Sequence, residues 1–418
     1  MLGFHDIFYL FVLYTSLFFL LFWLFVALDH AFIKDEKKKL KKLTSFPLVS
    51  IAIPAYNEER RIEKTMQSVV DLDYPSEKIE LLIMDDGSKD STKTIVEKFM
   101  KKNKDFNITL VSKPNRGKGA VINDALKLAK GEYFVIFDAD STIQSNALLE
   151  MLPHFEDKEV AAVLPVIKVR NPKTIIEKFQ WIEYLATFFY KYAMFFLDSV
   201  PVTPGPFSVF KKDVLIKIGG FSENNLTEDL EMSLRLQKHH YRLVQVMNVV
   251  SYTTAPDNVV AFYHQRNRWY KGGLVNSLKY RKLMFNKEYG DFGMMEFPSF
   301  LATGILIAIL FFMGLIKLIK QSVNWIENLI KIDFDIFSLL KSFEFHWFNI
   351  SYNILFLALM AMFFATILIV WSHQAHKEKI LKYGWFVLPI YLLVYGLFVM
   401  TIWLGVFLDF IFRRKQKW

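Results

Sequence analysis

An uninterrupted apolar stretch near the start of the chain limits what this sequence can fold into. Residues 7–28 carry no charged side chain and are long enough, as a helix, to cross about 30 Å of hydrocarbon. A signal peptide would have a shorter apolar core, a basic start and a cleavage site of small residues, which are missing here. Five lysines follow within residues 37–42, so the positive-inside rule predicts that the chain from residue 34 onward is cytoplasmic.

The C-terminal part repeats this apolar pattern. Residues 298–319, 350–371 and 385–412 are long apolar stretches, which predicts about three further spans. On this count the loop at 372–384 is cytoplasmic, but the basic residues at 413–417 fall outside, against the positive-inside rule. Two explanations stay open: the last stretch is re-entrant or passes twice, or one span is miscounted. The mixed segment at 325–348 is expected to lie along the membrane surface.

These stretches divide the chain into three parts. Residues 1–33 are predicted to be a transmembrane helix, residues 34–297 a cytoplasmic domain and residues 298–418 a transmembrane region. The protein is therefore expected in the plasma membrane with membrane lipids as partners. Its net charge of +9 comes partly from lysines beside apolar spans, which indicates an anionic membrane surface rather than nucleic acid. The absence of cysteine excludes disulfides, thiolate metal sites and a cysteine nucleophile.

The cytoplasmic part alternates between strand and helix patterns. Apolar, β-branched runs predict strands, and amphipathic stretches between them predict helices. Such alternation is typical of an α/β domain with a mostly parallel sheet and helices on both faces. The predicted strands are residues 49–54, 79–84, 108–112, 133–137 and 208–211, and the predicted helices are residues 58–70, 91–102, 119–129 and 212–218.

Polar clusters follow three of these strands. Tyr56 and Glu58 follow the first strand, Asp86 follows the second, and Asp138 and Asp140 follow the fourth. Ligands of parallel sheets bind beyond the carboxyl ends of the strands, so we expect the clusters to meet at one edge. Two carboxylates this close repel unless a cation lies between them, and Mg²⁺ and Mn²⁺ prefer oxygen ligands. A solvated turn after a strand is the alternative for the aspartate pair alone.

Three further segments allow a functional and an ordinary interpretation. Lys118, between two glycines that open a helix, suits a phosphate, although a simple glycine turn has the same composition. Glu228 and Asp229 follow Thr227, a natural N-cap, and two acids also suit a first helical turn for dipole reasons alone. The aromatic helix at 175–197 is expected at the membrane interface, with a core helix as the alternative.

A basic, aromatic segment at 264–272 lies in a second helix expected at the interface, about residues 262–285. In the binding interpretation Arg266 and Arg268 pair with phosphate and Trp269 offers a flat face to a sugar ring. In the ordinary interpretation the segment is a surface helix anchored at the lipid headgroups.

Taken in order, these motifs resemble those of the membrane-bound family 2 glycosyltransferases, which include the synthases of cellulose, chitin, hyaluronan and poly-N-acetylglucosamine. The resemblance covers about residues 48–272 and implies a GT-A (Rossmann-like) fold. It also implies a metal-dependent, inverting hexosyltransferase that uses a nucleotide-sugar donor and Mg²⁺ or Mn²⁺. The matching segments are residues 54–58, 85–88, 117–119 with Asn123, 138–140, 227–229 and 265–269.

The resemblance assigns roles to individual residues. The resemblance implies that Tyr56, Glu58 and Asp86 bind the nucleoside of the donor. Lys118 and Arg268 would bind its diphosphate, and Asp138 would also contact the donor. Asp138 and Asp140 would hold the metal, and Asp229, beside Glu228, matches the general base. Gln265 and Trp269 would meet the acceptor sugar, together with Gly205 in a Pro-Gly-Pro loop closer to hyaluronan synthases than to cellulose synthases.

The resemblance favours a processive polysaccharide synthase that uses UDP-N-acetylglucosamine or a similar UDP-sugar and exports its polymer, with an accessory export or regulatory subunit. One alternative is transfer of a single sugar to a lipid-phosphate or lipid-linked oligosaccharide. Another is an inactive sugar-binding or export subunit, against which the intact Asp138, Asp140 and Asp229 argue.

Overall fold

The computed structural model describes residues 4–32, 43–331, 352–375 and 377–412. The lysine cluster at 37–42, the basic tail at 413–417 and most of the mixed segment at 325–348 lie outside the described residues. What the sequence predicts for these three segments therefore stays a prediction.

An eight-stranded sheet forms the centre of the domain, in the order β3-β2-β1-β4-β7-β6-β8-β5. β1, β2, β3 and β4 are parallel, as predicted, but β7 runs antiparallel to β4 and β6, and β5 antiparallel to β8. Three strands, β5, β6 and β8, were not predicted. The bounds are β1 Val49–Ala55, β2 Ile79–Asp85, β3 Ile108–Ser112, β4 Tyr133–Ile136, β5 Thr142–Ile143, β6 Val160–Val169, β7 Ser208–Lys211 and β8 Arg242–Thr253.

Alternate side chains of each central strand enter two separate cores, because successive residues point to opposite faces of a sheet. On one face Ile51 packs with Met66 of α2 and Phe99 of α3. On the other face Ala52 packs with Ile122 of α4. The helices of this part are α2 Ile62–Val70, α3 Thr92–Lys102, α4 Lys118–Leu128, α5 Ala147–Met151, α7 Lys212–Lys217 and α8 Glu228–Lys238.

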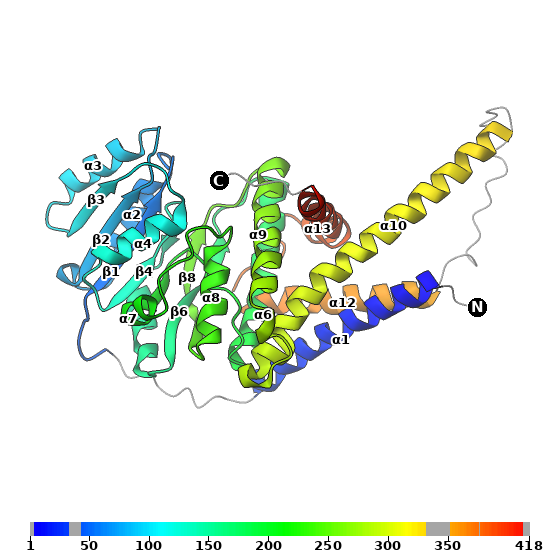
Figure 1. Cartoon of the computed structure of the whole chain (residues 1–418), viewed down its shortest axis with the longest axis horizontal. Coiled ribbons are helices and arrows are strands. Elements are labelled where there is room, and N and C mark those ends of the chain that lie inside the picture. The colour runs from blue at the N-terminus through cyan, green and yellow to red at the C-terminus, as the bar shows by residue number, and fades with distance from the viewer. Residues whose placement is uncertain (1–3, 33–42, 332–351, 376, 413–418) are drawn as a thin grey trace.

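Two long helices, α6 (Ile175–Phe196) and α9 (Val259–Lys279), stand between the sheet and the apolar helices (Figure 1). They correspond to the two helices predicted at the interface, although α9 begins earlier and ends earlier than residues 262–285. A buried ion pair between Arg266 of α9 and Glu183 of α6 joins them. Short 3-10 turns at Ser76–Lys78, Leu152–Glu156, Arg281–Leu283 and Lys287–Tyr289, and a π-helical turn at Phe292–Glu296, complete this region.

The remaining helices are apolar: α1 (Phe4–Phe32), α10 (Phe297–Lys331), α12 (Tyr352–Ala375) and α13 (Val387–Ile411). Within the described residues, two stretches are long and apolar enough to cross a membrane, Leu10–Asp29 and Val387–Ile411. The predicted number of C-terminal spans therefore stays a prediction. α10 does not end near residue 319 as predicted, and it continues without a break through the first residues of the segment expected on the surface.

The arrangement of α13 bears on the position of the C-terminus. α1, α10 and α12 run across the view of Figure 1, whereas α13 is seen end-on. The loop before α13 touches the sheet through a Lys168–Glu378 ion pair of 3.5 Å. Near the other end of α13, Asp409 lies 3.4 Å from Lys271 of α9. The loop before α13 and the last turns of α13 therefore both contact the domain, and the two explanations for the side of the C-terminus stay open.

Candidate active site

A cavity of about 390 Å³ opens beyond the carboxyl ends of β1, β2 and β4. The three polar clusters predicted to meet at one edge of the sheet do meet there. α4 and α9 supply the rest of its wall. The lining residues are Pro54, Ala55, Tyr56, Glu58, Asp86, Asn115, Gly117, Lys118, Val121, Asp138, Ala139, Asp140 and Arg268.

Lys118, the first residue of α4, is the cation at the centre of this site. Its ammonium lies 2.7 Å from Oδ1 of Asp138 and 3.1 Å from Oε1 of Glu228. Burial disfavours the charged ammonium, but Asp138, Glu228 and Asp229 outweigh it and raise the pKa of Lys118. The lysine stays charged and connects the aspartate pair to the start of α8. Sequence reasoning missed this connection, because nothing local relates residues 118 and 228.

α4 is held against the segment that leads to α8. The side chain of Asn123 donates to the Phe221 carbonyl at 2.9 Å and accepts from the Phe221 amide at 2.7 Å. Gly119 allows α4 to lie this close to the segment, because a Cβ at this position would lie only 3.2 Å from Cα of Glu223. These contacts fix the start of α4, and hence Lys118, relative to Glu228. The free amides at the start of a helix also favour an anion there.

Asp86 shapes the loop that precedes α4. Its two carboxylate oxygens accept from the backbone amides of Arg116 at 2.8 Å and Gly117 at 3.0 Å, and the residue is buried. Gly117 has a φ of +87°, in the left-handed region that favours glycine. Tyr56, by contrast, is 45% exposed and lines the cavity.

Three carboxylates, those of Glu58, Asp138 and Asp140, lie close together in the cavity lining. Burial, then the charge of Asp138, raises the pKa of Asp140. Burial, then the charge of Asp140, raises the pKa of Glu58 to about 7. This mutual repulsion is what a divalent cation would relieve, and oxygen donors are the ligands that Mg²⁺ and Mn²⁺ prefer. Asp138 and Asp140 both line the cavity and are the pair that would hold such a cation.

Gly205 lies behind Asp138. A Cβ at this position would be 2.7 Å from Cγ of Asp138 and closer still to both carboxylate oxygens. The segment is buried, and it leads directly into β7. The structure therefore places the predicted acceptor residue against Asp138, a predicted donor and metal residue, where its lack of a side chain leaves room for the carboxylate.

Asp229 lies in the first turn of α8, beside Glu228. Burial, then the charge of Glu228, raises the pKa of Asp229 to about 6, while Lys118 and Arg268 act in the opposite direction. Its Oδ1 accepts from the Leu230 amide at 2.8 Å. Asp229 is absent from the cavity lining but is within electrostatic range of two residues that line it.

Thr227 is the N-cap residue of α8, as predicted, although its side chain does not cap the helix. Its hydroxyl makes no capping hydrogen bond and instead accepts from Asn276 Nδ2 of α9 at 3.0 Å. Asn276 also exchanges two hydrogen bonds, of 2.7 and 3.1 Å, with Asn225. Gly272 of α9 packs so closely that a Cβ would lie 3.0 Å from Cβ of Thr227. α9 thus fixes the start of α8.

The residues of the α9 motif separate into two groups. Arg268 lines the cavity, as predicted for a phosphate partner. Arg266 does not: it is fully buried, pairs with Glu183 and lies 4.2 Å from the centroid of the Trp269 ring. The structure therefore contradicts the interpretation in which Arg266 binds phosphate. Gln265 accepts from Arg266 at 3.0 Å, and neither Gln265 nor Trp269 lines the cavity.

Known proteins resemble this chain in both sequence and fold. Residues 50–219 match the model of the family described as Glycosyl transferase family 2. The poly-beta-1,6-N-acetyl-D-glucosamine synthase of Staphylococcus epidermidis is 29% identical over 273 residues, 63% of this chain and 65% of that synthase. The synthase of the same name from Staphylococcus aureus strain COL is also 29% identical over 273 residues, 64% of this chain and 65% of its own length. The matched region is thus less than two thirds of each relative.

A solved mannosyltransferase from Pyrobaculum calidifontis, in complex with GDP-Man and Mn²⁺, superposes with a TM-score of 0.54. It is 24% identical and covers 65% of this chain and 74% of its own. At this identity the likeness concerns the fold alone. Together with the family match it confirms the predicted GT-A, Rossmann-like fold.

Proposed function

We propose that this chain, whose residues 50–219 match the model of glycosyl transferase family 2, transfers a hexose from a nucleoside-diphosphate donor to the end of a growing polysaccharide. UDP-N-acetylglucosamine is the proposed donor, since two matching relatives are poly-N-acetylglucosamine synthases. The observation that carries the proposal is the cavity at the strand ends, whose lining combines Glu58, Asp138 and Asp140 with Lys118 and Arg268. Carboxylates beside cations at a helix start suit a metal-bound diphosphate.

In this proposal the diphosphate lies between the start of α4 and Arg268, with Lys118 beside it. Tyr56 would lie against the nucleoside, and Asp86 would hold the loop of Gly117 in shape. Asp138 and Asp140 would hold Mg²⁺ or Mn²⁺, which as a Lewis acid neutralises the charge of the departing nucleoside diphosphate. Lys118 would then be shared between Asp138 and the phosphate oxygens.

The attacking sugar hydroxyl must lose its proton as it forms the new glycosidic bond, so one carboxylate in reach is needed. Asp229 is the proposed base. The hydroxyl oxygen attacks the anomeric carbon, the bond from that carbon to the diphosphate oxygen breaks, and Asp229 takes the proton. A pKa of about 6 keeps Asp229 deprotonated at neutral pH yet makes it a better proton acceptor than an ordinary aspartate.

We further propose that the catalytic domain faces the cytoplasm, where nucleotide sugars and the lysine cluster at 37–42 would be found. The two apolar helices with spanning length support membrane attachment. Export of the polymer along these helices, and an accessory subunit that assists it, belong to the same proposal.

The metal assignment predicts the behaviour of Asp140→Ala. The variant should lose the Mn²⁺-dependent part of UDP binding while its fold is kept, because the substitution removes a repelled carboxylate rather than a core side chain. Calorimetric titration of UDP with and without Mn²⁺ measures this difference. Asp105→Ala removes an exposed aspartate from a loop and serves as the matched control. Wild-type metal dependence in Asp140→Ala would remove Asp140 from the metal site.

The acceptor assignment predicts the behaviour of Trp269→Ala. The indole, fixed on one face by the Arg266 guanidinium, would support the terminal sugar between additions. The variant should make short products or none but still hydrolyse the donor, because the cavity residues are untouched. Sizing of products from radiolabelled UDP-N-acetylglucosamine on a gel tests this, with Trp325→Ala, an exposed tryptophan of α10, as the control.

The same gel separates the two enzyme interpretations. Long chains from the wild type support a synthase, whereas a single labelled sugar that partitions into organic solvent supports transfer to a lipid carrier. Unchanged chain length in Trp269→Ala would contradict the acceptor role of the indole.

A further inference from the structure

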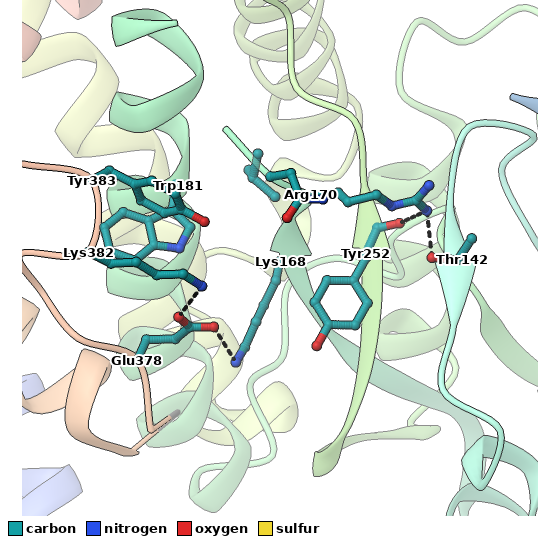
Figure 2. A pocket seen from close by; sticks show the side chains of 10 residues that line it. Thr142, Lys168, Arg170, Trp181, Tyr252, Glu378, Lys382 and Tyr383 are labelled. Atoms are coloured by element: carbon teal, nitrogen blue, oxygen red, sulfur yellow. Dashed lines mark hydrogen bonds and ion pairs between the residues drawn. The ribbon is translucent and has the colours of Figure 1, made fainter. Parts of the chain in front are cut away.

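A second cavity of about 390 Å³ lies outside the proposed active site, between the sheet and the loop that connects α12 to α13. We call it the lysine cavity. Figure 2 shows that its walls come from the end of β6, from β8, from α6 and from that loop. Its lining residues are Thr142, Lys168, Val169, Arg170, Asn171, Trp181, Tyr252, Glu378, Lys382 and Tyr383.

The lining carries more positive than negative charge. A single carboxylate, Glu378, lies 3.5 Å from the ammonium of Lys168 and 3.0 Å from that of Lys382. Burial disfavours the charge of Glu378, but the hydrogen bond from Lys382 and the charge of Lys168 hold its pKa below the usual range. One negative charge is therefore shared between two ammonium groups.

Arg170 adds a third cation. Its guanidinium points away from Glu378 and donates to the Thr142 hydroxyl and the Tyr252 carbonyl, which are neutral (Figure 2). Burial lowers the pKa of Arg170, and the charge of Asp140 opposes this only in part. Glu378 is thus the one carboxylate among the lining residues, and it pairs with Lys168 and Lys382 but not with Arg170.

We infer that the lysine cavity binds a phosphate-type anion, with Lys168 and Lys382 as its partners. Both ammonium groups donate hydrogen bonds in several directions, and a phosphate oxygen can accept from each while Glu378 keeps its own contacts. The hydroxyl groups of Tyr252 and Tyr383 are further donors in the lining. The anion could come from a soluble phosphate compound or from a phospholipid headgroup, which share this chemistry.

Such a ligand would join two parts of the molecule. Lys168 belongs to β6 of the sheet, and Lys382 belongs to the loop between two apolar helices. Thr142, which Arg170 holds, follows Asp140 by two residues and so connects the lysine cavity to the proposed metal side of the active site. Binding would therefore stabilise the attachment of the sheet to the apolar helices.

The test uses the purified full chain in detergent with EDTA, and inorganic pyrophosphate as the probe in calorimetric titration. Lys382→Met and Lys168→Met should each weaken the second binding event by about tenfold or more, because each removes a charge-assisted hydrogen bond. Lys379→Met, an exposed lysine of the same loop outside the lining, should bind as the wild type does. The proposed active site is the same in all three variants, so a difference between them belongs to the lysine cavity.

Vesicles distinguish the two sources of the anion. The melting temperature of the wild type and of Lys379→Met should rise when phosphatidylglycerol is added to phosphatidylcholine vesicles if the ligand is a headgroup, and that of Lys382→Met should not. Lys382 is largely exposed, so its replacement keeps the test valid even if Lys168→Met fails to fold. An equal response of Lys382→Met and Lys379→Met to both probes would overturn the inference.

Discussion

Asp229→Asn should lower turnover by about 10²–10⁴-fold while donor affinity barely changes. The amide keeps the size of the side chain and the hydrogen bond from the Leu230 amide can still form to its oxygen. What the variant loses is the ability to accept a proton. The measurements are the initial rate of sugar transfer and the UDP dissociation constant. Near-wild-type turnover would mean that Asp229 only begins a helix and that the base lies elsewhere.

Asp213→Asn is the matched control, because Oδ1 of Asp213 also accepts from the next backbone amide at 2.8 Å, but on the exposed start of α7. The pH dependence is a second readout. Since a protonated Asp229 cannot act as a base, kcat/KM should fall as the pH drops through about 6. The pKa of Glu58 is about 7. Glu58→Gln should therefore remove the part of the decrease in kcat/KM that Glu58 causes and keep the part that Asp229 causes.

Gly205→Ala is expected to impair the proposed active site strongly although it adds only one methyl group. The added Cβ would lie 2.7 Å from Cγ of Asp138, so the carboxylate must move away from Lys118 and from its place beside Asp140. A shift of about 1 Å in a reacting group can lower the rate on the order of 10²-fold. Transfer rate and Mn²⁺-dependent UDP binding should fall together.

The control for this prediction is Gly314→Ala in α10, where a Cβ would meet nothing within 4 Å. That variant should keep both activities. If Gly205→Ala also kept them, Asp138 would have to tolerate displacement, and its proposed contact with the metal would be wrong.

The strand ends could be predicted from sequence because each combines an apolar run with polar residues directly after it. Asp86, Asp138 and Glu58 therefore meet as expected. Contacts between distant segments carry no such local pattern. The Lys118–Glu228 ion pair and the Asn225–Asn276 hydrogen bonds depend on how α4, α8 and α9 pack, and periodicity does not describe packing.

The two arginines of α9 illustrate the same limit. Arg266 and Arg268 are two residues apart, and side chains two apart on a helix do not share a face. One of them had to point away from the cavity, but the sequence does not say which face of α9 meets the sheet. The structure turns Arg268 to the cavity and Arg266 to Glu183 of α6. The same holds for Thr227, which occupies the predicted N-cap position, but whose hydroxyl has its partner on another helix.

The packing of α13 has a practical consequence for producing the protein. Phe179 and Trp181 of α6 share one hydrophobic cluster with Val387 and Tyr395 of α13, and Tyr270 of α9 stacks on Trp403 at 5.1 Å. A fragment cut after residue 297 would present these aromatic faces to water, and large exposed apolar patches cause aggregation. The catalytic half should therefore be expressed with the apolar helices in place, in detergent or lipid, rather than as a soluble fragment.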